Sequence, residues 1–288
     1  MKTIIITDSC SDLPLKYIEE NYLHVLGLNV FFKGQDFQDD LGKTLKYKDF
    51  YEGVRAGDIP TTSQINVQAY LDAFKDYVLK GYSIIYLGLS SGLSGSMNSS
   101  YVAKASLLEE YPNADITIVD TKSVSLGLGL IVYYANEMLK KGALKQEIID
   151  WVENNKLKVN HWFTVDDLNH LKRGGRVSST AATIGTLLNI KPILHVDDEG
   201  RLVPISKAKG RKKSLRALVD IFKERAINPK NQIVFISHGD SEEDALLVKD
   251  MLLKETSVTN FIINPIGPVI GSHSGPGTIA IFFIGRNR

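Results

Sequence analysis

The chain has 288 residues, of which 43% are hydrophobic and 23% charged, and its formal net charge is +1. These values are typical of a soluble globular protein, and the length favours two domains over one. No apolar run approaches the roughly 20 residues that a membrane span needs, and the start turns polar too soon for a signal peptide. We therefore expect a cytoplasmic protein. The single cysteine, Cys10, excludes an internal disulfide and a cysteine-based metal cluster.

The charge is unevenly distributed along the chain. Residues 158–230 carry 15 Lys and Arg against 7 Asp and Glu, a net charge of +8, and the rest of the chain is net acidic. The densest basic segment is KAKGRKK, Lys207 to Lys213. It is either a solvated turn and helix start or a docking surface for an acidic partner. We expect no nucleic-acid partner, because the sequence contains no helix-turn-helix and no interleaved aromatic residues.

The first half alternates short β-rich runs with helical patterns. Strands are predicted at residues 3–7, 24–32, 83–89 and 115–119. Helices are predicted at residues 14–22, 47–55, 67–80, 96–111 and 126–140. Repeated strand–helix order of this kind indicates a parallel, Rossmann-like sheet with helices on both faces.

The pattern changes after a helix predicted at residues 145–155. Strands are then predicted at residues 161–165, 190–196, 202–205, 232–237, 258–264 and 278–284. Helices are predicted at 166–171, from near Ser178, at 213–225 and at 242–254, and DDEG at 197–200 has the chemistry of a hairpin turn. The sequence therefore predicts an α/β protein with a parallel-sheet domain over residues 1–157. A second α/β domain with a mixed or antiparallel sheet is predicted over residues 158–288.

Hydroxyl-rich loops follow the strands of the predicted parallel sheet. They are TDSCSD (7–12), SSGLSGS (90–96) and DTKSVSLG (120–127), and a further cluster, TTSQ (61–64), precedes a helix. Each loop alone is explained by helix N-capping, but together they could line an anion site at the carboxyl edge of the sheet. The chain has no G-x-x-x-x-G-K-[ST], and no glycine follows its first strand, so neither a nucleotide nor a dinucleotide cofactor is indicated. A carboxylate would suit such a site, because hydroxyl groups can donate hydrogen bonds to it and no metal ion is needed.

SSGLSGS has a second interpretation, the nucleophile elbow G-x-S-x-G of a serine acyl hydrolase, with Ser94 as nucleophile. Ser96 occupies the position where the elbow requires glycine. A triad would use His273 with Asp120 or Asp166. Cys10 is another candidate nucleophile, although a small filler in a capping loop is the more ordinary role.

Two glycine-rich segments of the second half complete the candidate set. GPVIGSHSGPGT (267–278) is expected to be a rigid, irregular loop that fixes His273 in position to donate to a ligand. KRGGR (172–176) is either a helix C-cap or a site where Arg173 or Arg176 recognises an anion.

These motifs, together with IKPIL at 190–194, resemble in order and spacing those of the DegV family of bacterial fatty-acid-binding proteins. The resemblance runs from the first strand to the last. It implies two α/β domains that enclose a long-chain, palmitate-like fatty acid, with no cofactor or metal. It also implies a non-catalytic binding subunit that presents the acyl carboxylate to the catalytic subunit of a fatty acid kinase.

The resemblance places the carboxylate contacts on Thr62, Ser94 and His273, with Ser63 and Gly95 beside the head group. It assigns Arg173 and Arg176 to kinase docking or phosphoryl transfer, and we expect Arg211, in the basic segment KAKGRKK, to share that role. The chain departs from the family pattern at Ser96, where threonine is common, and at Ile65-Asn66, where a proline often follows TSQ. Neither departure removes a proposed carboxylate contact.

Overall fold

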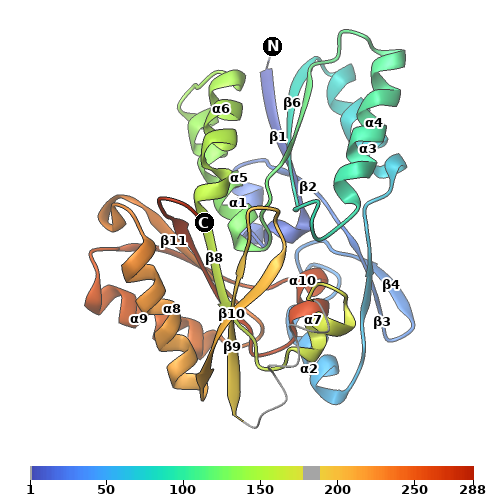
Figure 1. Cartoon of the computed structure of the whole chain (residues 1–288). Coiled ribbons are helices and arrows are strands. Elements are labelled where there is room, and N and C mark those ends of the chain that lie inside the picture. The colour runs from blue at the N-terminus through green and yellow to red at the C-terminus, as the bar shows by residue number, and fades with distance from the viewer. Residues whose placement is uncertain (1, 178–188) are drawn as a thin grey trace.

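The computed structural model describes residues 2–177 and 189–288. The helix expected from near Ser178 begins outside these ranges. The described chain forms three β-sheets. Figure 1 shows the parallel sheet with its helices in the upper part and the largest sheet with its helices below. No helix among the described residues is both long and apolar enough to cross a membrane.

The N-terminal sheet is parallel, which confirms the prediction. Its strand order is β2-β1-β6-β7, with the bounds β1 Lys2–Asp8, β2 His24–Leu26, β6 Tyr82–Gly88 and β7 Ile116–Asp120. The apolar run of β6 is buried on both faces, as a strand covered by helices on both sides requires. Helices α3 (Val67–Leu79) and α4 (Ser96–Glu110) lie on one side of this sheet, and α5 (Leu126–Lys140) and α6 (Lys145–Asn155) lie on the other (Figure 1).

The single strand predicted at 24–32 is wrong, because the segment divides between two sheets. After β2, the chain turns at Gly27, where an added Cβ would lie 2.6 Å from the carbonyl oxygen of Asp39. It then forms a small antiparallel sheet of order β4-β3-β5, with β3 Asn29–Phe32, β4 Gln35–Gln38 and β5 Thr61–Ser63. The TTSQ cluster therefore contributes a strand. The remaining short elements of this half are η1 Ser9–Ser11, α1 Leu15–Glu20 and α2 Tyr47–Ala56.

The C-terminal sheet is mixed, as predicted. Its order is β10-β9-β8-β13-β11-β12, with only the β11–β12 pair parallel. The strands are β8 Val159–Thr164, β9 Ile190–Val196, β10 Leu202–Lys209, β11 Ile233–His238, β12 Asn260–Pro265 and β13 Ile279–Ile284. The helices are η2 Lys156–Lys158, α7 Asn169–Arg173, α8 Arg211–Arg225, η4 Pro229–Asn231, α9 Glu242–Glu255 and α10 Pro268–Ser274.

The segment GPVIGSHSGPGT does not form the irregular loop that its glycines and prolines suggested. Residues 268–274 form helix α10, with Pro268 in its first turn, where a missing backbone N–H costs nothing. Only the sequence from Gly275 onward behaves as a turn, with positive φ at Gly275 and Gly277. His273 therefore lies in the last turn of a helix.

The two faces of the C-terminal sheet have different neighbours. On one face, Trp162, Ile281 and Phe283 belong to a buried cluster with residues of α8 and α9, and Figure 1 shows these helices together on the outer side. On the opposite face, Phe163 and Phe282 join the core of the N-terminal half. Side chains alternate between faces along a strand, so one sheet serves two cores.

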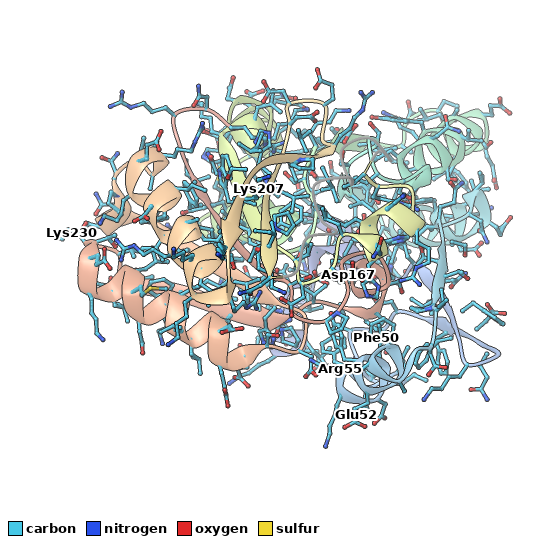
Figure 2. All side chains as sticks on the ribbon, turned by 60° about the horizontal axis from the view of Figure 1, so that its bottom comes forward. Phe50, Glu52, Arg55, Asp167, Lys207 and Lys230 are labelled. Atoms are coloured by element: carbon cyan, nitrogen blue, oxygen red, sulfur yellow. The ribbon has the colours of Figure 1, made fainter. Side chains whose placement is uncertain are left out.

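Helix α5 lies between the two large sheets, because it contacts both β1 and β6 on one side and β8, β11 and β13 on the other. Contacts outside this core also join the halves. One is the ion pair between Arg55 on α2 and Asp240 after β11; Figure 2 labels Arg55 beside Phe50 and Glu52. The boundary expected between residues 157 and 158 falls within η2 and stays a prediction.

Candidate ligand-binding site

A cavity of about 260 Å³ lies between the carboxyl edge of the parallel sheet, helix α10 and the inner face of the mixed sheet. Its wall is mostly apolar and includes Leu28, Leu93, Val124, Phe163, Ile270 and Phe282. Polar side chains interrupt this wall, and they include Thr62, Gln64, Ser94, Ser125, His161, Ser237 and His273. This combination is typical of a site for a small, largely apolar ligand whose orientation is fixed by a few polar contacts.

Helix α10 forms one long side of the cavity. Its lining residues are Val269, Ile270, His273 and Ser274, and Ile266, just before the helix, lines the cavity as well. This spacing of three and four places one face of the helix against the cavity. The opposite side of α10 packs closely on α2, because an added Cβ at Gly271 would lie 2.7 Å from the Tyr51 hydroxyl.

Thr62 and His273 meet at the C-terminal end of α10. The Thr62 hydroxyl is 2.8 Å from Nε2 of His273. Strand β5 carries Thr62 to this point, because it pairs with β3 at Val30. Nδ1 of His273 has no hydrogen-bond partner among the described residues. Burial, and secondly the nearby Arg176 guanidinium, lower the His273 pKa to about 4, so the imidazole is neutral at pH 7.

The loop after β6 brings Ser94 and Gly95 to the same cavity, and Ser63 lies on its wall as well. The Ser94 hydroxyl is 3.0 Å from that of Ser96 and accepts a bond from the Ser96 amide. The loop is anchored in the other half of the chain, because the Ser90 hydroxyl donates to the Gly200 carbonyl at 2.9 Å. All five head-group residues suggested by the sequence are thus brought together.

Helix capping accounts for only part of the hydroxyl-rich loops: Asp8 is the N-cap of η1 and accepts from the Cys10 amide, and Ser94 accepts from the amide of Ser96, the first residue of α4. Helix α3 is capped by Asn66, whose side chain accepts from the Ala69 amide, and TTSQ takes no part. The N-cap positions of α4 and α5 are Gly95 and Ser125, and neither makes a side-chain capping bond. Ser94 and Ser125 both also line the cavity.

The three arginines predicted to serve docking or phosphoryl transfer differ in their surroundings. Arg176 lines the cavity and is half-buried, and its Nε and Nη2 donate to the Leu93 carbonyl at 3.3 and 3.2 Å. Arg173 is exposed on α7, with Nη2 3.2 Å from Nδ1 of His170. Arg211 forms an ion pair with Asp244 at 2.8 Å.

The basic segments of the C-terminal half do not form one patch. KAKGRKK is divided between the end of β10 and the start of α8, with Gly210 between them. In Figure 2, Lys207 on β10 and Lys230 beyond α8 lie well apart. The net charge of residues 158–230 is therefore spread over the surface.

A second group of polar side chains lies at the other end of α10. The Ser125 hydroxyl is 2.5 Å from Oδ2 of Asp12 and 3.1 Å from the Ser237 hydroxyl. Ser125 and Ser237 line the cavity, and Asp12 lies behind them, where its Oδ1 accepts from the amide of Gly267 at 2.9 Å. We call Asp12, Ser125 and Ser237 the inner polar group.

Burial raises the pKa of the carboxyl groups around the inner polar group. The pKa is raised to about 8 for Asp12, about 6 for Asp8 and about 7 for Asp39, in each case mainly by loss of solvent. The sequence marked Asp12 and Ser125 only as members of hydroxyl-rich loops. It contained no signal for Ser237, which follows an ordinary apolar run in β11.

The geometry does not assemble the triad that a serine hydrolase would need. Nε2 of His273 pairs with Thr62, whereas the Ser94 hydroxyl pairs with Ser96. Asp166 is engaged with Lys191 at 2.7 Å, and Asp120 accepts from the amide of Ser91. Cys10 is fully buried and its pKa is raised, mainly by burial, which fits a filler role.

Metal ligation has no candidate cluster in the part of the chain that the structure describes. No group of three or more His, Cys, Asp or Glu side chains is placed there to hold an ion. The polar groups that line the cavity are therefore hydroxyls, the Gln64 amide, the imidazoles of His161 and His273, whose pKa values are both lowered mainly by burial, and the Arg176 guanidinium.

Comparisons with known proteins agree along the whole chain. The model of the DegV family, described as uncharacterised proteins, matches residues 2–286. A DegV domain-containing protein of Clostridium perfringens is 49% identical over 287 residues, which cover 100% of this chain and 99% of that protein.

Solved structures also match over nearly the full length. A DegV family protein from Thermus thermophilus, described as binding fatty acid, has a TM-score of 0.89 at 30% identity and covers 99% of this chain and 100% of its own. DegV from Bacillus subtilis, described as a fatty acid binding protein, has a TM-score of 0.83 at 32% identity, with 99% and 100% coverage. A stearic acid-binding protein from Eubacterium ventriosum has a TM-score of 0.85 at 26% identity, with 99% and 98% coverage.

Proposed function

This chain belongs to the DegV family, and we propose that it binds a long-chain fatty acid in the cavity along α10. The observation that carries the proposal is the Thr62–His273 pair, which lies at one end of a cavity whose wall is mostly apolar. The fatty acid binding described for the Thermus and Bacillus relatives supports the ligand class.

The carboxylate of the ligand is held at the end of the cavity formed by Thr62, Ser94 and His273. We call these three residues the clamp. Hydrogen bonds to an ionised acceptor are about twice as strong as neutral ones, so three donors suffice to fix the orientation. The positive charge of Arg176, which is close enough to lower the His273 pKa, also favours an anion here. Ser63 and Gly95 lie beside the head group.

The acyl chain occupies the apolar remainder of the cavity, against side chains such as Phe163, Ile270 and Phe282. Each methylene removed from water contributes roughly 0.8 kcal/mol, so a 16-carbon chain contributes on the order of 10 kcal/mol before ordering costs. Affinity then comes mainly from the chain, and the clamp decides which end of the ligand faces the surface.

The protein acts as a non-catalytic subunit and presents the carboxylate to a fatty acid kinase, which forms the acyl phosphate. Arg173 is the arginine best placed for docking, because it is exposed on α7. Arg176 has a positioning role, since its guanidinium holds the loop that carries Ser94. Arg211, paired with Asp244, shapes the surface near the start of α8.

The ligand class is tested by extracting purified protein with organic solvent and weighing the lipid by mass spectrometry. We expect one or a few fatty acids of about 16–18 carbons in near-stoichiometric amount. Protein that contains no fatty acid and takes up none when incubated with palmitate would refute the proposal.

The non-catalytic role is tested separately with a fluorophosphonate probe and with ATP. We expect no covalent labelling of Ser94, and we expect acyl phosphate only when the kinase subunit and ATP are both present. Labelling that disappears in Ser94→Ala would favour the hydrolase. Loaded protein that yields no acyl phosphate with the kinase subunit would remove the kinase role and leave binding intact.

A further inference from the structure

We infer that the inner polar group is a second ligand-recognition site within the acyl part of the cavity, and that it accepts a hydroxyl group carried near the middle of a fatty acid chain. The inference rests on the proposed function and specifies a narrower class of ligand for the same cavity. It names a hydroxylated long-chain fatty acid as the preferred ligand.

The position of the inner polar group follows from helix α10. Asp12 accepts from the amide of Gly267, at the start of α10, whereas His273 lies in its last turn. The six residue-to-residue steps from Gly267 to His273 span about 9 Å at 1.5 Å per step. An extended carbon chain advances roughly 1.2 Å per bond, so the group lies roughly seven bonds or more from the carboxylate.

The side chains of this group are built into the protein interior. Ser237 and Asp12 are 0% and 1% exposed, and Ser125 is 5% exposed. Ser237 projects from the inner face of the mixed sheet, where its cross-strand neighbour Ala280 also lines the cavity. A polar side chain placed among Phe163, Ala280 and Phe282 is unusual for a wall that only has to contact methylene groups.

Within the inner polar group, the Ser237 hydroxyl can still form hydrogen bonds with a ligand in the cavity. Within the described residues, the only partner of the Ser237 hydroxyl is the Ser125 hydroxyl, which also bonds Asp12. A serine hydroxyl can donate once and accept twice. When the Asp12 carboxyl is protonated, it donates to Ser125 and Ser125 donates to Ser237. The Ser237 proton is then free to be donated to a ligand oxygen.

When the Asp12 carboxyl is ionised, the chain of donors reverses. Ser125 then donates to Asp12, and Ser237 donates to Ser125, so the Ser237 oxygen accepts from the ligand. A hydroxyl group both donates and accepts, and it therefore fits either state. A ligand with a second carboxylate does not fit here. Three buried carboxyl groups already lie nearby, and their raised pKa values show that this environment disfavours negative charge.

The inference is tested by measuring dissociation constants for stearate, 2-hydroxystearate, 10-hydroxystearate and 12-hydroxystearate by competition with a fluorescent fatty acid. One additional buried hydrogen bond predicts that 10- or 12-hydroxystearate binds roughly three- to tenfold more tightly than stearate. The 2-hydroxy acid places its hydroxyl beside the clamp and should gain nothing from the inner polar group.

Ser237→Ala should abolish the preference, so that stearate and the two mid-chain hydroxy acids bind this variant with equal affinity. Ser125→Ala provides a second variant should the first fail to fold. The matched control is Ser214→Ala, a buried serine on α8 whose hydroxyl donates to the Arg211 carbonyl and does not line the cavity. The control should keep the preference.

Two outcomes overturn the inference. One is equal binding of stearate and both mid-chain hydroxy acids by the native protein, and the other is a preference that survives in Ser237→Ala. Both leave fatty acid binding itself intact. Failure of stearate and every hydroxystearate to bind would instead refute the proposed function.

Discussion

The two polar ends of the cavity use the same kinds of side chain in opposite electrostatic surroundings. The clamp is only partly buried, its histidine is neutral, and the guanidinium of Arg176 lies close by. The inner polar group is almost fully buried, and its neighbours are carboxyl groups whose pKa values are raised. An anion is therefore stabilised at the clamp and destabilised at the inner end. Hydroxyl groups alone therefore do not define an anion site. The charges and the solvent exposure around them determine whether an anion is stabilised.

The largest expected effect comes from removing one donor of the clamp. Thr62→Val keeps the shape of the side chain and deletes its hydroxyl. Because hydrogen bonds to charged groups contribute about 1.5–3 kcal/mol, we expect fatty acid to bind about ten- to a hundredfold more weakly. Equilibrium competition with a fluorescent fatty acid measures the change.

The control for this variant is Thr44→Val, which removes an exposed hydroxyl that bonds Asp40. It should leave affinity unchanged. Wild-type affinity in Thr62→Val would show that the clamp does not hold the carboxylate and would remove the contrast between the two ends.

The next effect is expected from Asp12→Asn in the inner polar group, because the asparagine amide mimics the protonated carboxyl. A folded-state pKa of about 8 lies above the ordinary value near 4, so the native state binds more protons than the unfolded state between these pH values. Stability of the wild type should therefore fall as pH rises from about 4 to about 8, by at most about 1.4 kcal/mol per pH unit for this group. The variant should show a smaller slope and greater stability at pH 8.

Urea unfolding at pH 5, 6, 7 and 8 measures these slopes. Asp36→Asn on β4 is the control, because that carboxyl is exposed and its variant should follow the wild type. Asp8 and Asp39 also have raised pKa values, so some slope should persist in Asp12→Asn. An unchanged slope would show that Asp12 is ionised throughout.

The smallest effect is expected from Arg176→Met, which retains much of the apolar stem but removes the charge and both bonds to the Leu93 carbonyl. We expect a several-fold faster loss of fatty acid, because the loop that carries Ser94 is less constrained. We also expect the His273 pKa to rise above about 4 but to stay below its ordinary value, since burial is the larger cause. NMR titration of the histidine separates these effects, and an unchanged His273 pKa would contradict the proximity of the two groups.

The sequence was sufficient to predict both large sheets, because their strands are continuous apolar runs separated by clear helical patterns. It failed at residues 24–32, which were predicted as one strand although Gly27 and Asn29 are poor strand formers; the chain passes from one sheet to the other after β2, and Gly27 packs against the Asp39 carbonyl there. It also failed at residues 268–274, where glycine and proline suggested an irregular loop. Pro268 lies in the first turn, where it is compatible with a helix, and Gly271 allows contact with Tyr51.

The candidate site was predicted unevenly. Thr62, Ser94 and His273 belong to motifs with unusual composition, so the resemblance could assign them. Their joint position depends on β5 pairing with β3, which no local pattern indicates. Ser237 and the orientation of Arg176 were out of reach, because both depend on contacts between residues more than 80 positions apart.

Helix α5 has a consequence for how fast a ligand can be exchanged. Its glycines pack closely against both halves of the chain. An added Cβ at Gly127 would lie 2.0 Å from Nε2 of His161, and one at Gly129 would lie 2.6 Å from the Ser11 carbonyl oxygen. Swinging the two halves apart would expose the fully buried Leu128 and Leu130 to water. We therefore expect the residence time of a fatty acid to be set by local opening near Arg176 and the loop of Ser94, with the two halves staying together throughout.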